Sequence, residues 1–132
     1  MSAGKRVLVV DDDVDFNDAV TLTLEAAGYQ VLAAHSADEA MKLLRSERVD
    51  IAILDMMMEE PDAGAMVAHT LRRRPEMADI PVLLVTGVTG KTGYRPGTEG
   101  AAPRGWLGVD AWLDKPVNPS ELLRKIEALT HE

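Results

Sequence analysis

The chain has 132 residues, 46% of them hydrophobic, which suits one domain over 1–132 with a core from about residue 5 to residue 130. Its net charge of −8 argues against a nucleic-acid partner, its lack of cysteine excludes disulfides and thiolate metal sites, and no apolar run reaches the roughly 20 residues of a membrane span. These features predict a cytoplasmic protein that binds neither nucleic acid nor a membrane.

Five short runs of mostly apolar residues predict buried β-strands. They span residues 7–10, 30–34, 51–54, 82–85 and 111–114. Residues with helical spacing follow each of the first three runs and also the last one. Alternation of strand and helix is typical of a parallel sheet that carries helices on both faces. The sequence therefore predicts the α/β class.

Local signals mark where these helices begin and end. Gly28 follows the first helical segment, at the position where glycine commonly ends a helix. Ser36 and Glu39 form a capping box at the start of the second segment. Asn118 is placed to cap the last one. A third segment, which ends near Arg74, has small and apolar residues on one face: Gly64, Val67, Ala68 and Leu71.

Residues 87–108 interrupt this alternation. The stretch contains several glycines and two prolines, and it lacks helical periodicity. A helix should connect the last two strands there, so we predict that the fourth helix is degenerate or missing. Long irregular stretches in compact domains are usually functional or mobile. We therefore treat 87–108 as a glycine-rich irregular insertion.

Acidic and polar residues stand where four of the apolar runs end. In chain order these residues are Asp11, Asp12, Asp55, Thr86 and Lys115. The carboxyl ends of parallel strands meet at one edge of a sheet, and open α/β sheets bind their ligands in the crevice beyond that edge. We therefore expect the five side chains to converge on one site.

The chemistry of these side chains points to phosphoryl transfer. Adjacent carboxylates need a proton or a cation to balance their charge, and Mg²⁺ prefers carboxylate, water and phosphate oxygens, so we predict that Asp11 and Asp12 hold Mg²⁺. Asp55, alone at the end of the central strand, is the best candidate for a nucleophile that forms an aspartyl phosphate. Thr86 and Lys115 would supply a hydroxyl and an ammonium group to the phosphoryl oxygens.

Two neighbouring acids are explained without a ligand. Asp13 and Asp15 fall at the start of the first helical segment, where the helix dipole favours negative charge. Together with Asp11 they imitate the start of a calcium-binding EF-hand loop. Phe16 and Leu22, however, occupy the positions where that loop needs glycine and glutamate.

Four motifs together resemble the CheY-like receiver domain of response regulators, the phospho-acceptor module of two-component signalling. They are Val9-Val10-Asp11-Asp12, Ile53-Leu54-Asp55, Val85-Thr86-Gly87 and Leu113-Asp114-Lys115-Pro116. The resemblance runs from about Lys5 to about Thr130. It implies a flavodoxin-like (βα)5 fold, which is a three-layer sandwich around a parallel five-stranded sheet of order 2-1-3-4-5.

The resemblance also implies roles for individual residues. Asp55 would accept a phosphoryl group from the phosphohistidine of a sensor histidine kinase or a phosphotransfer protein, and Thr86 and Lys115 would contact the phosphoryl oxygens. Trp112 occupies the position of the family's switch aromatic, so phosphorylation would reshape a protein-binding surface. The Mg²⁺ ligands would be three acid side chains and one backbone carbonyl, those of Asp11, Asp12, Asp55 and Met57.

We interpret the chain as a stand-alone receiver that acts on a downstream protein, and not as a turnover enzyme. The alternative is a phospho-independent scaffold that retains an acidic pocket. An aspartate-nucleophile phosphatase ranks last, because Met57 stands where such an enzyme needs a second acid after Asp55. The sequence identifies neither the kinase nor the downstream partner, and a monomer and a homodimer are both compatible with it.

Overall fold

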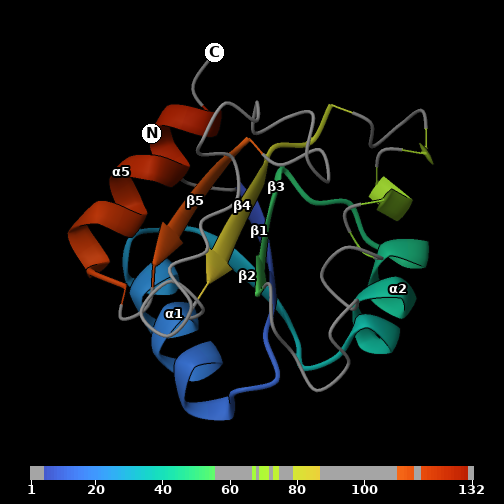
Figure 1. The fold of residues 1–132 in the computed structure, drawn as a ribbon, viewed down its shortest axis with the longest axis horizontal. Coiled ribbons are helices and arrows are strands. Elements are labelled where there is room, and N and C mark those ends of the chain that lie inside the picture. The colour runs from blue at the N-terminus through green and yellow to red at the C-terminus, as the bar shows by residue number, and fades with distance from the viewer. Residues whose placement is uncertain are drawn as a thin grey trace.

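The computed structural model describes residues 5–55, 67, 69–71, 73–74, 79–86, 110–114 and 117–130. Five parallel strands in this part of the chain form one sheet of order β2-β1-β3-β4-β5 (Figure 1). This result confirms the predicted α/β class and strand order. The strands are β1 (Arg6–Val10), β2 (Gln30–Ala34), β3 (Ile51–Asp55), β4 (Val82–Thr86) and β5 (Ala111–Asp114).

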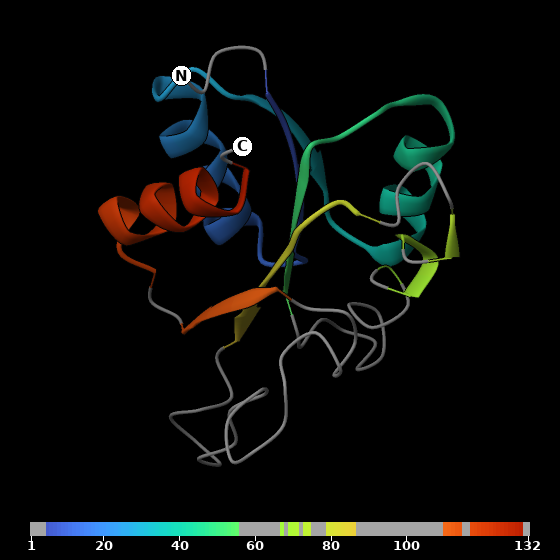
Figure 2. The same ribbon diagram turned by 90° about the horizontal axis from the view of Figure 1, so that it is seen from above.

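Helices cover both faces of the sheet and complete a three-layer arrangement (Figure 2). Helices α1 (Val14–Ala26) and α5 (Pro119–Thr130) lie side by side on one face. Helix α2 (Ala37–Ser46) lies on the other face, together with the helical residues described between 67 and 73. This layering is the flavodoxin-like arrangement that the strand order predicts.

The strands supply both cores because successive residues of a strand point to opposite faces. In β1, Val7 and Val9 pack with α1 and α5, whereas Leu8 and Val10 pack with α2. Because helices cover both faces, side chains on either face of the central strands are shielded from water and can all be apolar. The central strand β3 is accordingly buried at all five positions.

The predicted helix signals are confirmed. Gly28 ends the first helical segment with φ 98°, a conformation that only glycine adopts easily. The Ser36 hydroxyl accepts a hydrogen bond from the Glu39 N–H at 3.1 Å. The Asn118 side chain accepts bonds from the N–H groups of Ser120 and Glu121 at the start of α5. These bonds satisfy N–H groups that have no partner inside their own helix.

Two further predictions have different outcomes. The third helical segment is confirmed where the structure describes it, with Val67 and Leu71 buried against α2. The stretch 87–108 lies outside the described residues, so the degenerate fourth helix stays a prediction. Among the helices of the described part, none combines the length and the apolar character needed to cross a membrane.

Candidate metal centre

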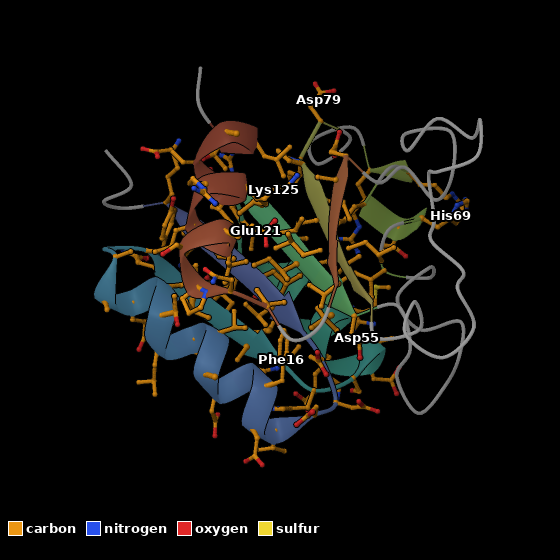
Figure 3. All side chains as sticks on the ribbon, turned by 60° about the vertical axis from the view of Figure 1, so that its left-hand side comes forward. Phe16, Asp55, His69, Asp79, Glu121 and Lys125 are labelled. Carbon is orange, nitrogen blue, oxygen red and sulfur yellow. The ribbon has the colours of Figure 1, made fainter. Side chains whose placement is uncertain are left out.

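Three acid side chains meet at the carboxyl end of the sheet. One carboxylate oxygen each from Asp11, Asp12 and Asp55 can be chosen so that the three atoms lie within 4.8 Å of one another. Asp11 and Asp55 are only 1% and 3% exposed, and Asp12 is half-buried. Figure 3 shows Asp55 at the end of its strand. The structure thus brings together the three acids that the sequence predicts to converge.

The register of the two central strands explains this meeting. Val10, the last residue of β1, lies opposite Leu54 of β3. One position further along each strand direction, Asp11 and Asp55 come to the same level of the sheet. Both follow fully buried apolar residues, so their carboxyl groups leave the core where it ends. A polar residue directly after each apolar run is therefore sufficient to build the pair.

Backbone groups hold the loop between β1 and α1 in place. The Asp11 N–H donates to the Ala34 carbonyl at 3.1 Å, which ties this loop to the end of β2. The Asp13 N–H donates to Asp11 Oδ1 at 2.9 Å. Asp13 is itself the N-cap of α1, because its carboxylate accepts a bond from the Phe16 N–H at 3.2 Å. Asp13 therefore serves the helix, as predicted, and one oxygen of Asp11 already has a backbone donor.

Asn17 is a supporting residue that the sequence reasoning missed. It is 1% exposed, and its side-chain N–H₂ donates to the carbonyls of Asp11 and Ala34 at 3.1 and 3.0 Å. It thereby joins Asp11, the residue that follows β1, to the end of β2. One signal was present, because Asn17 shares a helical face with the buried residues Val20 and Leu24. A polar residue on an apolar face calls for a buried hydrogen-bond partner.

The donor set fits a hard divalent cation. Like charges this close, two of them on buried groups, disfavour one another unless a proton or a cation balances them. Carboxylate oxygens suit Mg²⁺ and Ca²⁺, and Mg²⁺ in particular is held by one or two carboxylates together with waters and phosphate oxygens. The half-buried position of Asp12 leaves the cluster open to solvent on one side. The cluster can therefore hold a metal ion that also contacts a ligand from outside.

The outer rim of this edge carries a second acidic group. His35 follows β2, and its N–H donates to Glu39 Oε1 at 2.9 Å, while its ring Nδ1 lies 3.5 Å from the same oxygen. The backbone N–H of His35 is the main reason that the pKa of the Glu39 carboxyl lies below its ordinary value. Glu39 is therefore ionised at neutral pH and fastens the loop that leads into α2.

The remaining predicted site residues are described only in part. Thr86 is the last residue of β4, and Trp112 lies in β5 opposite Leu84, which places their backbones but not their side chains. Met57 and Lys115 lie outside the described residues. Thr86 pairs with Asp114 in the β4–β5 ladder, and Lys115 follows Asp114 in the sequence.

A parallel sheet of this order, with three clustered acids at its carboxyl edge, defines a flavodoxin-like α/β protein with a candidate metal centre. The sequence profile of the response regulator receiver domain matches residues 7–127. The chain therefore belongs to the receiver-domain family of two-component response regulators. Receiver domains are signalling domains that interact with histidine kinases or phosphotransfer proteins. Phosphorylation and magnesium binding are typical of the family.

Two solved structures illustrate the similarity of fold. A CheY-like receiver domain from Methanospirillum hungatei JF-1 aligns with a TM-score of 0.77 and 30% identity, covering 95% of this chain and 93% of the other. The chemotaxis response regulator CheY4 of Vibrio cholerae aligns with a TM-score of 0.80 and 27% identity, covering 95% and 98%. These likenesses confirm the flavodoxin-like architecture.

Curated relatives are longer proteins. The DNA-binding dual master transcriptional regulator RpaA of Synechocystis is 34% identical over 94% of this chain, which corresponds to 48% of RpaA. The phosphate regulon regulator PhoB of Pseudomonas aeruginosa is 29% identical over 96% of the chain and 52% of PhoB. The chain thus spans about half the length of the curated relatives that it matches. The expectation that it binds no nucleic acid stays a prediction.

Proposed function

We propose that this domain accepts a phosphoryl group on Asp55 from the phosphohistidine of a histidine kinase or a phosphotransfer protein, with Mg²⁺ as cofactor. The observation that carries the proposal is the cluster of Asp11, Asp12 and Asp55 at the carboxyl end of the sheet. A buried carboxylate beside two further acids is suited to receive a phosphoryl group only if a cation balances the charge. The proposal concerns the domain itself, whether it acts alone or beside another domain.

Each residue would have a defined chemical task. A carboxylate oxygen of Asp55 forms a bond to phosphorus in line with the breaking phosphorus–nitrogen bond, and the imidazole nitrogen keeps the electron pair. Asp11 and Asp12, with the Met57 carbonyl, would hold Mg²⁺, which neutralises charge on the acids and on the phosphoryl oxygens. The hydroxyl of Thr86 and the ammonium group of Lys115 would bind the remaining phosphoryl oxygens.

Phosphorylation would be read out as a shift between two conformations. Thr86 ends β4, and Trp112 lies in the neighbouring strand β5, so a movement at Thr86 has a short route to the aromatic position. A ligand changes such an equilibrium only by as much as it favours one state, and here the bond from Thr86 to the phosphoryl group would supply that preference. The surface around β5 would then gain or lose affinity for a downstream protein.

The alternative is a receiver-like scaffold that binds its partner without phosphorylation. Such a scaffold would need neither a metal ion nor a phosphoryl-accepting residue. It therefore does not explain why three acid side chains lie so close together. Phosphotransfer therefore explains more of the site. A phosphatase that uses an aspartate nucleophile gains no support from the receiver-domain match.

Intact-mass analysis tests the proposal. The wild-type protein and Asp55→Asn are incubated with a small acyl-phosphate donor and Mg²⁺, and the variant Asp13→Asn serves as matched control, because asparagine also caps helices well. We expect one phosphate adduct on the wild type and on the control, none on Asp55→Asn, and none without Mg²⁺.

Two results would contradict this proposal. Equal labelling of Asp55→Asn would show that another residue is the acceptor. Absence of an adduct with both the small donor and a phosphorylated histidine kinase would favour the scaffold instead.

A further inference from the structure

Two aspartates make the same pair of contacts at the amino-terminal edge of the sheet, opposite the acid cluster. Asp50 directly precedes β3, and its Oδ2 accepts from the N–H of Arg6 at 2.8 Å while its own N–H donates to the Arg6 carbonyl at 2.8 Å. Asp110 directly precedes β5 and makes the same two bonds with Val82, at 2.8 and 2.9 Å. We call each pair of bonds a strand-start clamp.

Each clamp is in register with the ladder that follows it. Asp50 and Arg6 are 44 positions apart in sequence, as are the paired residues Ile51 and Val7. Asp110 and Val82 are 28 positions apart, as are Ala111 and Leu83. A shift of either strand by one residue would take the carboxylate away from the N–H that it accepts. The clamps therefore favour one register over its neighbours.

The two strands depend on their clamps to different degrees. β3 pairs with β1 on one side and with β4 on the other, and it is buried at all five positions. β5 has four residues and, among the described strands, pairs with β4 alone. Residues 87–110 separate β4 from β5, and a connection of this length does not fix the register as a tight turn does. The Asp110 clamp is therefore a larger part of what aligns its strand.

The surroundings of the clamps strengthen this contrast. Arg6 is held in two further ways, because its guanidinium bonds to the Glu47 carboxylate at 2.9 Å and to the Arg48 carbonyl at 3.2 Å. Asp50 is exposed, so water can replace its carboxylate. The bond from the Val82 N–H to Asp110 is partly buried, and a buried N–H without an acceptor is costly.

We propose that Asp110 is a positioning residue for the phosphoryl contacts. Its clamp aligns β5 so that Asp114 lies opposite Thr86, and Lys115 is the next residue in the chain. A slip of one residue would displace the end of β5 by about 3.3 Å and turn each side chain to the other face. This inference rests on the proposed function, because Lys115 matters only if Asp55 takes a phosphoryl group.

The rate of adduct formation on Asp55, with a small acyl-phosphate donor and Mg²⁺, is the first readout. Asp110→Ala removes the carboxylate, and we expect it to slow labelling by about tenfold to a hundredfold, because a misplacement of about 1 Å can lower a rate by about a hundredfold. Asp50→Ala is the matched control, since it removes the equivalent clamp from β3, which pairs with a strand on each side and depends less on its clamp. We expect this control to label at the wild-type rate. Asp110→Asn keeps an acceptor oxygen and should largely restore the rate.

A second experiment, in the Lys115→Ala variant, distinguishes a positioning role of Asp110 from a general effect on stability. We expect Lys115→Ala to label slowly by itself, and adding Asp110→Ala should then slow labelling no further, because the residue that Asp110 positions is gone. A general loss of stability would instead slow labelling in both backgrounds and in Asp50→Ala as well. Amide exchange at Val82 should speed up in Asp110→Ala. If Asp110→Ala does not fold, Asp110→Ser provides the same comparison, because its shorter side chain holds the Val82 N–H less well than the carboxylate does.

The possible failures are distinguishable. Labelling of Asp110→Ala at the wild-type rate would overturn the positioning role and leave the proposed function intact. Equal slowing by Asp50→Ala, or further slowing in the Lys115→Ala background, would also overturn it. A wild-type protein that takes no label from any donor would overturn the proposed function, and the role of Asp110 with it.

Discussion

Val10 of β1 lies opposite Leu54 of β3, and the next residue along each strand is a buried aspartate. This single register brings Asp11 and Asp55 to the same level at the carboxyl edge of the sheet, where Asp12 joins them. The candidate metal centre is thus a consequence of how two apolar strands align. Substitutions of these acid residues can test its affinity for Mg²⁺ and its effect on the stability of the fold.

Mg²⁺ should stabilise the folded protein through the acid cluster. A ligand that binds only the folded state raises the free energy of unfolding by about 2.7 kcal/mol at a concentration 100 times its dissociation constant. We expect such a gain for the wild type and a much smaller one for Asp12→Asn, measured by urea unfolding with and without Mg²⁺. Asp15→Asn is the control, because Asp15 is exposed on α1. If Asp12→Asn and Asp15→Asn lost the Mg²⁺-dependent gain in unfolding free energy equally, the gain would come from general screening of charge by the salt.

Without metal, the substitution Asp55→Asn should stabilise the fold. It removes one of three neighbouring negative charges while keeping the shape of the side chain, and we expect a gain on the order of 1 kcal/mol in the free energy of unfolding. The measurement is urea unfolding in the presence of a chelator. Asp38→Asn, which removes an exposed charge from the first turn of α2, should give no such gain. A destabilised Asp55→Asn would mean that repulsion does not dominate at this site.

Asn17→Ala should weaken both stability and metal binding. It leaves the Asp11 carbonyl without its side-chain donor in a buried place, which costs about 1–3 kcal/mol in the free energy of unfolding. Because Asn17 also ties Asp11 to the end of β2, affinity for Mg²⁺ should fall as well. Thr21→Val is a suitable control, since it removes a long bond of 3.5 Å from the Thr21 hydroxyl to Asn17 and leaves both bonds of the Asn17 N–H₂ group in place. Unchanged Mg²⁺ affinity in Asn17→Ala would limit its role to stability.

The Glu39 carboxyl should add a small stabilisation that depends on pH. Its pKa is lowered in the folded state, mainly by the His35 N–H, so its contribution is complete above the ordinary carboxyl pKa and is lost as the pH falls through the lowered value. The difference in unfolding free energy between wild type and Glu39→Gln should therefore be fully present above the ordinary carboxyl pKa and shrink as the pH falls through the lowered pKa of Glu39. Urea unfolding over a pH series measures it. If the difference in unfolding free energy grew as the pH fell through the lowered pKa of Glu39, the prediction would be contradicted.

Much of the fold was predictable because the relevant interactions are local. Gly28, Ser36 and Asn118 end or begin helices through bonds to residues only a few positions away, so sequence spacing predicts them. The continuous apolar runs predicted strands that are covered on both faces, and the strands lie where expected. The strand order came from the resemblance to a family, since local spacing does not specify which strands are neighbours.

The supporting contacts were not predictable, because they join residues far apart in the chain. Asn17 was passed over as one polar residue in a helix, yet it bonds to Ala34 across two strand ends. Asp50 and Asp110 look like ordinary polar residues before a strand. Their partners, Arg6 and Val82, are known only once the strands are aligned.

The class of fold, the acid residues and their chemistry follow from residue type and from position after an apolar run, so they can be predicted without coordinates. The closeness of Asp11, Asp12 and Asp55, their depth of burial and the backbone groups that hold them become known only once the chain is folded. These features depend on the register of parallel strands, which long connections do not fix and which packing and edge hydrogen bonds must set.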